Sequence, residues 1–241
     1  EKTLVIFTPA IPKNHSELIY FKENNFNILK RAQVLGMISK NTFCLAVAGT
    51  HGKTTTSAIL GHIMTRVNAT SFLGGISENY NSNLLLGEDK ICVVEADEFD
   101  RSFLQLHPNI ACVTSMDADH LDIYKEASAL EESFVAFSQQ VSETLIVAKG
   151  LPLKGLTYAI NETADYQAYN LKIASGKYIF DVKTPVSEIK NIEFHLPGKH
   201  NVMNALAALA MADSYGISLE EIKQSLATFK GVKRRFTYKI K

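Results

Sequence analysis

Continuous apolar runs of strand length recur along the middle of the chain, separated by amphipathic stretches with helical spacing. Such runs are expected for strands that are buried on both faces of a parallel sheet, and they occupy residues 43–48, 91–94, 110–114 and 144–148. Helical patterns lie at residues 54–66 and 126–140. Alternation of strand and helix predicts an α/β fold with a mostly parallel sheet flanked by helices.

The pattern changes near residue 155 to short alternating segments, which predict a small antiparallel β layer. These segments are residues 156–160, 169–173, 178–182 and 192–195. A helix over 201–215 should then end at Gly216, and a second helix should begin at Ser218 with a capping box completed by Glu221.

The chain opens with a short predicted strand at residues 4–7 and two predicted helices, at 16–25 and 31–40. One or two βα units are too few for an independent nucleotide-binding domain. We therefore expect residues 1–40 to be the end of a preceding domain and the main domain to begin at residue 41. The last residues, 231–241, read as the start of another strand.

Composition narrows the class of protein. The 241 residues carry 25 basic and 25 acidic side chains, so no net charge draws the chain to nucleic acid or to an anionic membrane. No apolar run approaches the roughly 20 residues of a membrane-spanning helix. Three cysteines, Cys44, Cys92 and Cys112, lie in apolar runs without a CxxC pair, which indicates buried reduced thiols and a cytoplasmic protein.

The segment GTHGKTTT follows a buried strand and opens a helix, which is the arrangement of a phosphate-binding loop. Glycines let backbone N–H groups face phosphate oxygens, while the lysine reaches the terminal phosphates and the first threonine can bind Mg²⁺. The match is the short form GxxGKT, because Val47 stands where the longer P-loop pattern has glycine. A glycine turn with a solvated lysine is the alternative. The candidate nucleotide-binding residues are Gly49, Thr50, His51, Gly52, Lys53, Thr54 and Thr55.

Acidic and histidine side chains follow the next two predicted strands. Glu95 ends the strand at 91–94, and His120 closes the sequence DADH after the strand at 110–114. Carboxyl ends of parallel strands share one edge of the sheet, so both residues could serve a magnesium ion near the phosphates. A solvated acidic loop and a structural histidine are the alternatives.

A turn that runs into a helix carries Asn201 and Asn204 on one helix face, and paired amides can satisfy the edge of a purine. Helix capping is the alternative explanation. Near the end of the chain, Arg234 and Arg235 either contact a transferring phosphate or form a basic linker.

Five motifs, GTHGKTTT, VVEADE, DADH, PGKHNVMNALAA and GVKRRF, occur in this order, and together they resemble the Mur ligase family of peptidoglycan synthesis. The resemblance implies a P-loop-type central ATPase domain over residues 41–232, preceded by the end of a UDP-binding domain and followed from residue 233 by the start of a C-terminal domain. The forms EADEFDRSF and DADHLDIY are most similar to the branch that adds L-alanine to UDP-N-acetylmuramate.

The resemblance also implies a reaction and roles for residues. The lactyl carboxylate of UDP-N-acetylmuramate would be phosphorylated by ATP, and the amine of L-alanine would attack the acyl phosphate. Lys53 would hold the β and γ phosphates, Thr54 one Mg²⁺, and Glu95 with His120 a second Mg²⁺. The residues expected near the nucleotide are His200, Asn201, Asn204 and Arg235.

Two other functions remain open at this point. A related ligase attaches a whole tripeptide to UDP-N-acetylmuramate and shares the loop GTHGKTTT, although DADHLDIY argues against it. A non-catalytic nucleotide-binding module could also use this scaffold, although Lys53, Thr54, Glu95 and His120 occurring together argue against that. The sequence leaves the oligomeric state open.

Overall fold

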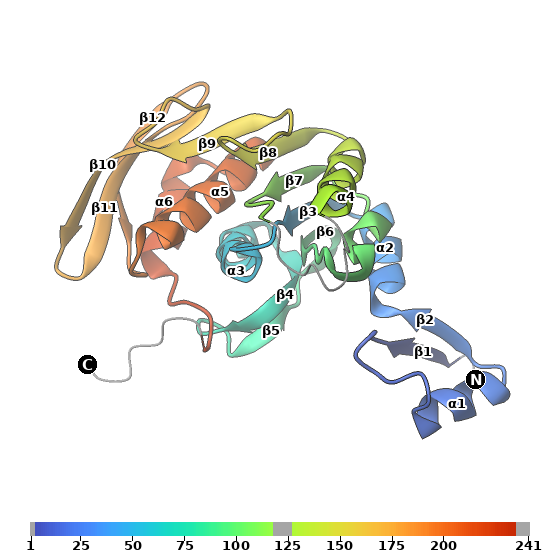
Figure 1. The fold of residues 1–241 in the computed structure, drawn as a ribbon. Coiled ribbons are helices and arrows are strands. Elements are labelled where there is room, and N and C mark those ends of the chain that lie inside the picture. Colours follow the sequence, from blue (N-terminus) through green and yellow to red (C-terminus); the bar gives the residue numbers. More distant parts are fainter. Residues whose placement is uncertain (1–2, 118–126, 235–241) are drawn as a thin grey trace.

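A ten-stranded sheet runs through the computed structural model, which describes residues 3–117 and 127–234 (Figure 1). In spatial order its strands are β12 (Glu188–Phe194), β11 (Lys177–Lys183), β10 (Tyr166–Ala174), β9 (Leu156–Ile160), β8 (Thr144–Ala148), β7 (Ile110–Val113), β3 (Phe43–Ala48), β6 (Glu88–Glu95), β4 (Ala69–Ser77) and β5 (Ser82–Leu85). Neighbours from β10 through β4 pair in parallel, whereas β12 with β11, β11 with β10, and β4 with β5 pair antiparallel. The predicted mostly parallel α/β fold is confirmed.

Helices cover both faces of this sheet (Figure 1). One face packs against α3, α5 and α6, and the other packs against α2, α4 and η2. The helical segments in chain order are α1 (Ser16–Glu23), α2 (Arg31–Asn41), α3 (Lys53–Met64), η1 (Thr65–Val67), η2 (Phe99–Gln105), α4 (Ala127–Gln139), α5 (Lys199–Tyr215) and α6 (Leu219–Thr228).

The central strand β3 explains why the sheet is buried on both sides. Successive side chains of a strand point to opposite faces. Leu45 and Val47 accordingly join the core under α3 and α5, whereas Cys44, Ala46 and Ala48 join the core under α2 and α4. Because helices cover both faces, β3 has no solvent-facing side on which polar residues could alternate with apolar ones. This accounts for the continuous apolar run in the sequence.

The antiparallel segments expected after residue 155 need a correction. They continue the main sheet edge to edge and do not form a separate layer, and β9 pairs in parallel with both β8 and β10. Only β10, β11 and β12 have the expected antiparallel pairing. Alternation of apolar and polar residues shows that one face of a strand is exposed, but it does not fix the direction of its neighbour.

Strands β2 (Asn27–Lys30), β4 and β5 were not predicted from the sequence. Strand β4 contains Gly74 and Gly75 among serine and threonine, a composition that weakens the strand signal. It nevertheless pairs in parallel with β6, which in turn lies next to the central strand β3. This position places Gly74 close to Glu95, the last residue of β6.

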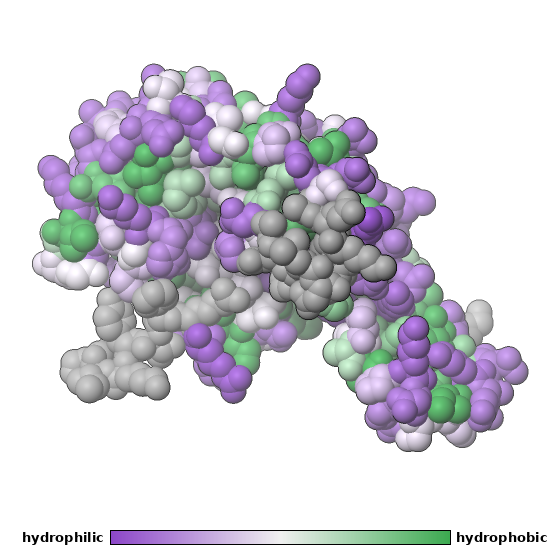
Figure 2. Space-filling model, viewed as in Figure 1, coloured by the Kyte–Doolittle hydropathy of each residue, from purple (hydrophilic) through white to green (hydrophobic). Residues whose placement is uncertain are grey.

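The first residues form a small unit at one end of the molecule, apart from the large sheet (Figure 1). Strands β1 (Leu4–Phe7) and β2 pair in parallel as a separate two-stranded sheet, with α1 in the connection between them. In the space-filling view this unit projects from the body, and hydrophilic side chains predominate over the face shown (Figure 2). The β1–β2 sheet is thus separate from the ten-stranded sheet, whereas α2 packs on the latter, and the domain boundary at residue 40 stays a prediction.

Local signals in the sequence produced the expected helix ends. Gly216 ends α5 with a φ of 108°, and Ser218 caps α6, where its side chain and that of Glu221 form the predicted capping box. The three cysteines are buried and free, as predicted. Among the helices of the described ranges, none has the length and apolar character needed to cross a lipid bilayer.

Candidate nucleotide-binding site

The loop between β3 and α3 depends on two glycines. Gly49 has a φ of 134° and Gly52 a φ of 85°, which are backbone conformations that favour glycine. Space is also restricted, because a Cβ on Gly49 would lie 2.2 Å from Oγ1 of Thr114 and one on Gly52 would lie 2.6 Å from Oδ1 of Asn204. The sharp turn brings the N-terminus of α3 to the carboxyl end of β3, as a phosphate-binding loop requires.

The segment that follows β7 is hydrogen-bonded to this loop. The Thr50 and Ser115 hydroxyl oxygens lie 2.9 Å apart, and the His51 N–H donates to Oγ of Ser115 at 2.7 Å. Oγ1 of Thr114 donates to the His51 carbonyl at 2.5 Å, and the Asp117 N–H donates to Oγ1 of Thr50 at 3.1 Å. Nothing in the sequence pattern marked Thr114 or Ser115, whose role becomes visible once β7 lies next to β3.

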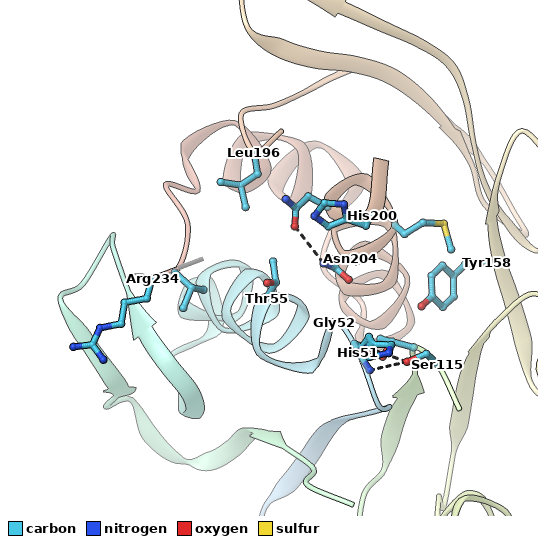
Figure 3. A pocket seen from close by; sticks show the side chains of 13 residues that line it. His51, Gly52, Thr55, Ser115, Tyr158, Leu196, His200, Asn204 and Arg234 are labelled. Atoms are coloured by element: carbon cyan, nitrogen blue, oxygen red, sulfur yellow. Dashed lines mark hydrogen bonds between the residues drawn. The ribbon is translucent and has the colours of Figure 1, made fainter. Parts of the chain in front are cut away.

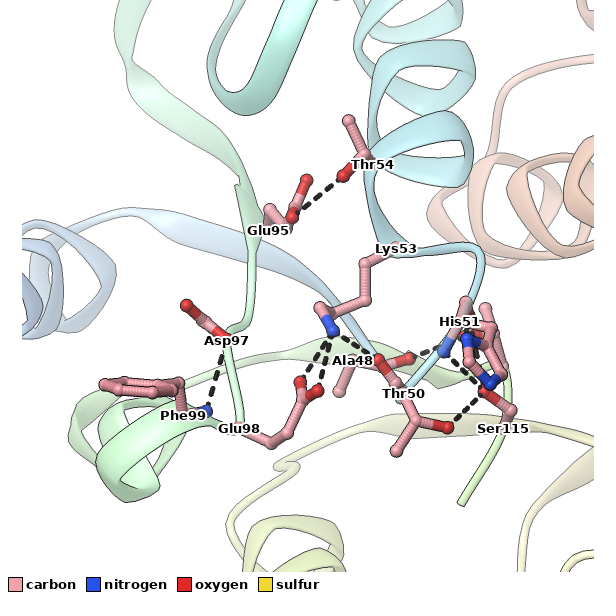
Figure 4. A network of polar contacts seen from close by, with 12 residues as sticks. Ala48, Thr50, His51, Lys53, Thr54, Glu95, Asp97, Glu98, Phe99 and Ser115 are labelled. Carbon is pink, nitrogen blue, oxygen red and sulfur yellow. Dashed lines mark hydrogen bonds and ion pairs between the residues drawn. The ribbon is translucent and has the colours of Figure 1, made fainter. Parts of the chain in front are cut away.

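Lys53, the first residue of α3, folds back over the loop (Figure 4). Its Nζ donates to the Gly49 carbonyl at 2.6 Å and lies 2.9 Å and 2.7 Å from Oε1 and Oε2 of Glu98. The Lys53 side chain is 12% exposed and that of Glu98 is 1% exposed, so this ion pair is largely shielded from water. The sequence did not distinguish Glu98 from the other acids after Glu95, which it offered as supporting or helix N-terminal groups.

Glu95 and Thr54 meet at the end of β6. Oγ1 of Thr54 donates to Oε1 of Glu95 at 3.1 Å (Figure 4), while Oγ of Ser57 and the Gly74 N–H donate to Oε2 at 3.3 Å and 3.1 Å. A Cβ on Gly74 would lie 2.2 Å from Oε2 of Glu95, so glycine is required there by close approach. The unpredicted strand β4 therefore orients the predicted carboxylate.

The donor set at this position fits Mg²⁺ bound together with phosphates. Mg²⁺ in nucleotide sites commonly takes one or two protein oxygens and completes its shell with phosphate oxygens and water. Thr54 and Glu95 supply a hydroxyl and a carboxylate at 3.1 Å from each other. In the part of the chain that the structure describes, there is no group of three or more histidine, cysteine, aspartate or glutamate side chains that could hold a metal ion. Phosphate oxygens and water would therefore have to supply most of the ligands.

A cavity of about 830 Å³ opens beside the loop and contains most of the predicted nucleotide-binding residues (Figure 3). The residues from that prediction that line it are His51, Gly52, Thr55, His200, Asn201 and Asn204. Its volume is in the range of small-molecule sites. The site is therefore large enough for a nucleotide whose phosphates lie on the loop.

The two asparagines on α5 are buried, and their amides are engaged. Nδ2 of Asn204 donates to Oδ1 of Asn201 at 3.3 Å, and Nδ2 of Asn201 donates to the Pro197 carbonyl at 2.6 Å. Oγ1 of Thr56 donates to Oδ1 of Asn204 at 3.3 Å. The Thr56–Asn204 bond joins the start of α5 to α3, so it connects the cavity wall to the helix that follows the phosphate loop.

Other side chains around the cavity differ in character. Burial, together with the neighbouring Cys112 thiol, raises the pKa of Tyr158 well above its usual value, so this cavity-lining phenol stays neutral. Arg234 also lines the cavity, on the far side from Tyr158 (Figure 3). The sequence offers both Arg234 and Arg235 as phosphate contacts, and the family resemblance places Arg235 near the nucleotide. Both Arg235 and His120 lie outside the described residues, so their assignments stay predictions.

A second cavity, of about 230 Å³, has Glu95 in its lining. Lys30 and Arg31 line it from the N-terminal part of the chain, and Glu95 and Asp97 line it from the acidic segment, which we define as residues 95–100. Nζ of Lys30 also lies 3.2 Å from Oδ2 of Asp100. Glu95 thus lines this smaller cavity, while its carboxylate accepts a hydrogen bond from Thr54 at the start of α3.

Comparisons with known proteins agree with this geometry. The family described as the Mur ligase middle domain matches residues 47–212. A protein of Flavobacterium psychrophilum named UDP-N-acetylmuramate–L-alanine ligase is 60% identical over the whole chain, and one of the same name from Christiangramia forsetii is 56% identical. The chain spans about 55% of the first and 54% of the second.

A solved structure resembles the chain over nearly its full length. It is the UDP-N-acetylmuramate–alanine ligase MurC from Thermotoga maritima, which has a TM-score of 0.87 and 28% identity. The match covers 98% of this chain and 57% of that protein. Both the sequence and the structure comparison thus align this chain with part of a longer protein.

Proposed function

We propose that this chain, which belongs to the Mur ligase family, is the ATP-binding part of an enzyme that joins L-alanine to UDP-N-acetylmuramate. The observation that carries ATP binding is the glycine loop that ends in Lys53 at the start of α3, with Thr54 bonded to the Glu95 carboxylate. The choice of L-alanine is supported by the names of the relatives, which are 56% and 60% identical over the whole chain.

The proposed reaction has two steps. An oxygen of the lactyl carboxylate attacks the γ phosphorus of ATP, and the bond to the β–γ bridging oxygen breaks, which leaves an acyl phosphate and ADP. The amine nitrogen of L-alanine then attacks the acyl carbon, phosphate leaves, and the nitrogen loses a proton. Negative charge develops in both steps, so fixed positive groups and backbone donors are the catalytic features that the site needs.

The described residues can supply those features. The loop from Gly49 to Gly52 would place phosphate oxygens at the N-terminus of α3, where free backbone N–H groups bind them, and Lys53 would hold the β and γ phosphates. Thr54 would hold one Mg²⁺ and Glu95, with His120, a second near the acceptor. Mg²⁺ bound there would neutralise phosphate charge.

The base and the acceptor are proposed to occupy the two cavities. Asn201 and Asn204, beside His200 in the larger cavity, would hold adenine, and Arg235 would approach the phosphates. The smaller cavity is a suitable place for the acceptor carboxylate, because Glu95 borders it and Lys30 and Arg31 are cationic.

The domain assignment follows the same reasoning. We propose that residues 1–40 end a UDP-binding domain, that residues 41–232 form the ATP-binding domain and that residues 233–241 begin a C-terminal domain. The separate β1–β2 sheet supports the first boundary. Buried free cysteines are consistent with a cytoplasmic enzyme, which we propose as its location.

Phosphate release by the full-length protein tests the function. The assay contains ATP, Mg²⁺ and UDP-N-acetylmuramate, with either L-alanine or the tripeptide L-alanyl-γ-D-glutamyl-meso-diaminopimelate. Turnover with L-alanine alone is expected. Turnover with the tripeptide alone would reassign the protein to the tripeptide-adding ligases, and nucleotide binding without turnover would indicate a non-catalytic module.

A matched pair of variants on one strand tests the site. Glu95→Ala is expected to abolish ligation, whereas Glu88→Ala at the other end of β6 should leave it unchanged, because Glu88 is exposed and pairs with Lys90. Ligation that survives Glu95→Ala would contradict the assignment.

A further inference from the structure

Glu98 is buried although it carries a carboxylate and lies only three residues beyond Glu95. Its side chain is 1% exposed, and both of its oxygens lie within 3 Å of Nζ of Lys53, at 2.9 Å and 2.7 Å (Figure 4). A buried charge of this kind is tolerated when an opposite charge and hydrogen bonds compensate for lost hydration. The pair therefore links the acidic segment directly to the lysine of the phosphate loop.

Lys53 makes two hydrogen bonds and one further ion-pair contact. An ammonium group has three N–H donors. In this structure its neighbours are the Gly49 carbonyl at 2.6 Å and the two oxygens of Glu98. A phosphate that draws Nζ of Lys53 away from these oxygens therefore competes with the Glu98 charge.

The backbone around Glu98 is held by hydrogen bonds, which favours movement of the lysine over movement of the acidic segment. The Arg101 N–H donates to the Glu98 carbonyl at 2.9 Å, and the Phe103 N–H donates to the Asp97 carbonyl at 2.9 Å. Phe103 is buried and stacks on Phe137 with ring centroids 4.9 Å apart. Lys53, in contrast, carries its ammonium on a flexible four-carbon chain.

We propose that Glu98 is a positioning residue that holds Lys53 folded over the phosphate loop until the nucleotide's β and γ phosphates take its place. The inference rests on the proposed function, because it assumes that the loop binds a nucleoside di- or triphosphate. Glu98 then opposes nucleotide binding in the free protein. It also keeps the lysine charge from being exposed in an empty loop.

The test compares binding of ADP and AMP to the full-length protein by calorimetry, in EDTA so that divalent cations do not contribute. AMP lacks the phosphates that Lys53 is proposed to reach. Glu98→Gln removes the competing charge with little change of shape, and we expect the Kd of ADP to fall about tenfold, a change of about 1.4 kcal/mol. The Kd of AMP should change less than about twofold.

Three variants separate positioning from a structural role. Asp100→Asn is the matched acid-to-amide control on the exposed part of the same segment, and it should leave the ADP to AMP ratio unchanged. Glu98→Asp keeps the charge on a shorter side chain, so its effect should have the same sign and be smaller, and it provides the test if the amide variant does not fold. In a Lys53→Met background, Glu98→Gln should no longer affect ADP binding.

The outcomes distinguish this inference from the proposed function. Unchanged or weaker ADP binding relative to AMP in Glu98→Gln and Glu98→Asp would overturn the role of Glu98, and so would an equal change for both nucleotides. A wild-type protein that binds neither nucleotide would overturn the proposed function itself.

Discussion

Replacement of Gly74 by alanine adds a single carbon next to the carboxylate of Glu95. The N–H of Gly74 donates to Oε2 of Glu95 at 3.1 Å, and an added Cβ would lie 2.2 Å from Oε2 and 2.4 Å from both Oε1 and Cδ. Contacts under 3.0 Å essentially do not occur for real Cβ atoms, so the carboxylate must move. Gly74 does not have a positive φ, so the perturbation is steric and does not strain the backbone.

The geometry gives the size of the effect. Restoring an ordinary contact requires the Glu95 carboxylate to shift by about 1 Å, and a misplacement of that size in an active site can cost about 100-fold in rate. We therefore expect kcat/KM for ligation to fall about 100-fold, or about 2.7 kcal/mol. Overpacking should lower the free energy of unfolding by about 1–3 kcal/mol.

Phosphate release by the full-length variant, measured across a range of Mg²⁺ concentrations, provides the kinetic measurement, and thermal unfolding provides the stability. Gly61→Ala in α3 is the matched control, because its Cβ would meet Oγ of Ser71 at 3.0 Å, away from the loop. It should keep wild-type kinetics. If Gly74→Ala ligates within about threefold of wild type, or if both variants lose activity equally, the role given to Glu95 is wrong.

Three further outcomes follow from the described contacts. Gly52→Ala, at a φ of 85° and 2.6 Å from Oδ1 of Asn204, should abolish detectable ADP binding in calorimetry. Asn204→Ala should lower the free energy of unfolding by about 1–3 kcal/mol in urea titrations, because the Thr56 hydroxyl loses its acceptor. Burial lowers the pKa of His62, which hydrogen-bonds Tyr80, so the unfolded chain binds more protons in mild acid. Stability should therefore fall as pH drops below about 6.5, and the fall should be smaller in His62→Gln.

Features encoded by neighbouring residues were predictable from the sequence. The apolar run over β3, the loop glycines and Lys53 at the start of α3 belong to one continuous segment, so their geometry follows from local backbone preferences. The Ser218 capping box is a similar case, since its two partners lie three residues apart. The strand and helix order that follows from such signals determines the class of fold.

Contacts between distant segments could not be predicted in the same way. Gly74 and Glu95 are 21 residues apart, and their bond depends on β4 lying beside β6 in one particular register. Lys53 and Glu98 are 45 residues apart. The partner of Gly74, or of Glu98 among the four acids of its segment, cannot be identified until the order of the strands is known.

The two glutamates of the acidic segment differ because the strand ends between them. Glu95 is the last residue of β6 and lies opposite Val47, which directs its half-buried carboxylate toward donors on α3 and β4. Hydroxyl and amide groups are neutral donors, so the carboxylate keeps its negative charge and can still bind a cation. Glu98 lies beyond the strand, where the chain turns under the loop, and there its charge is matched by Lys53. One carboxylate is thus available to a metal and nucleotide, while the other is already neutralised. We therefore expect the Mg²⁺ dependence of the reaction to respond to Glu95 and nucleotide affinity without Mg²⁺ to respond to Glu98.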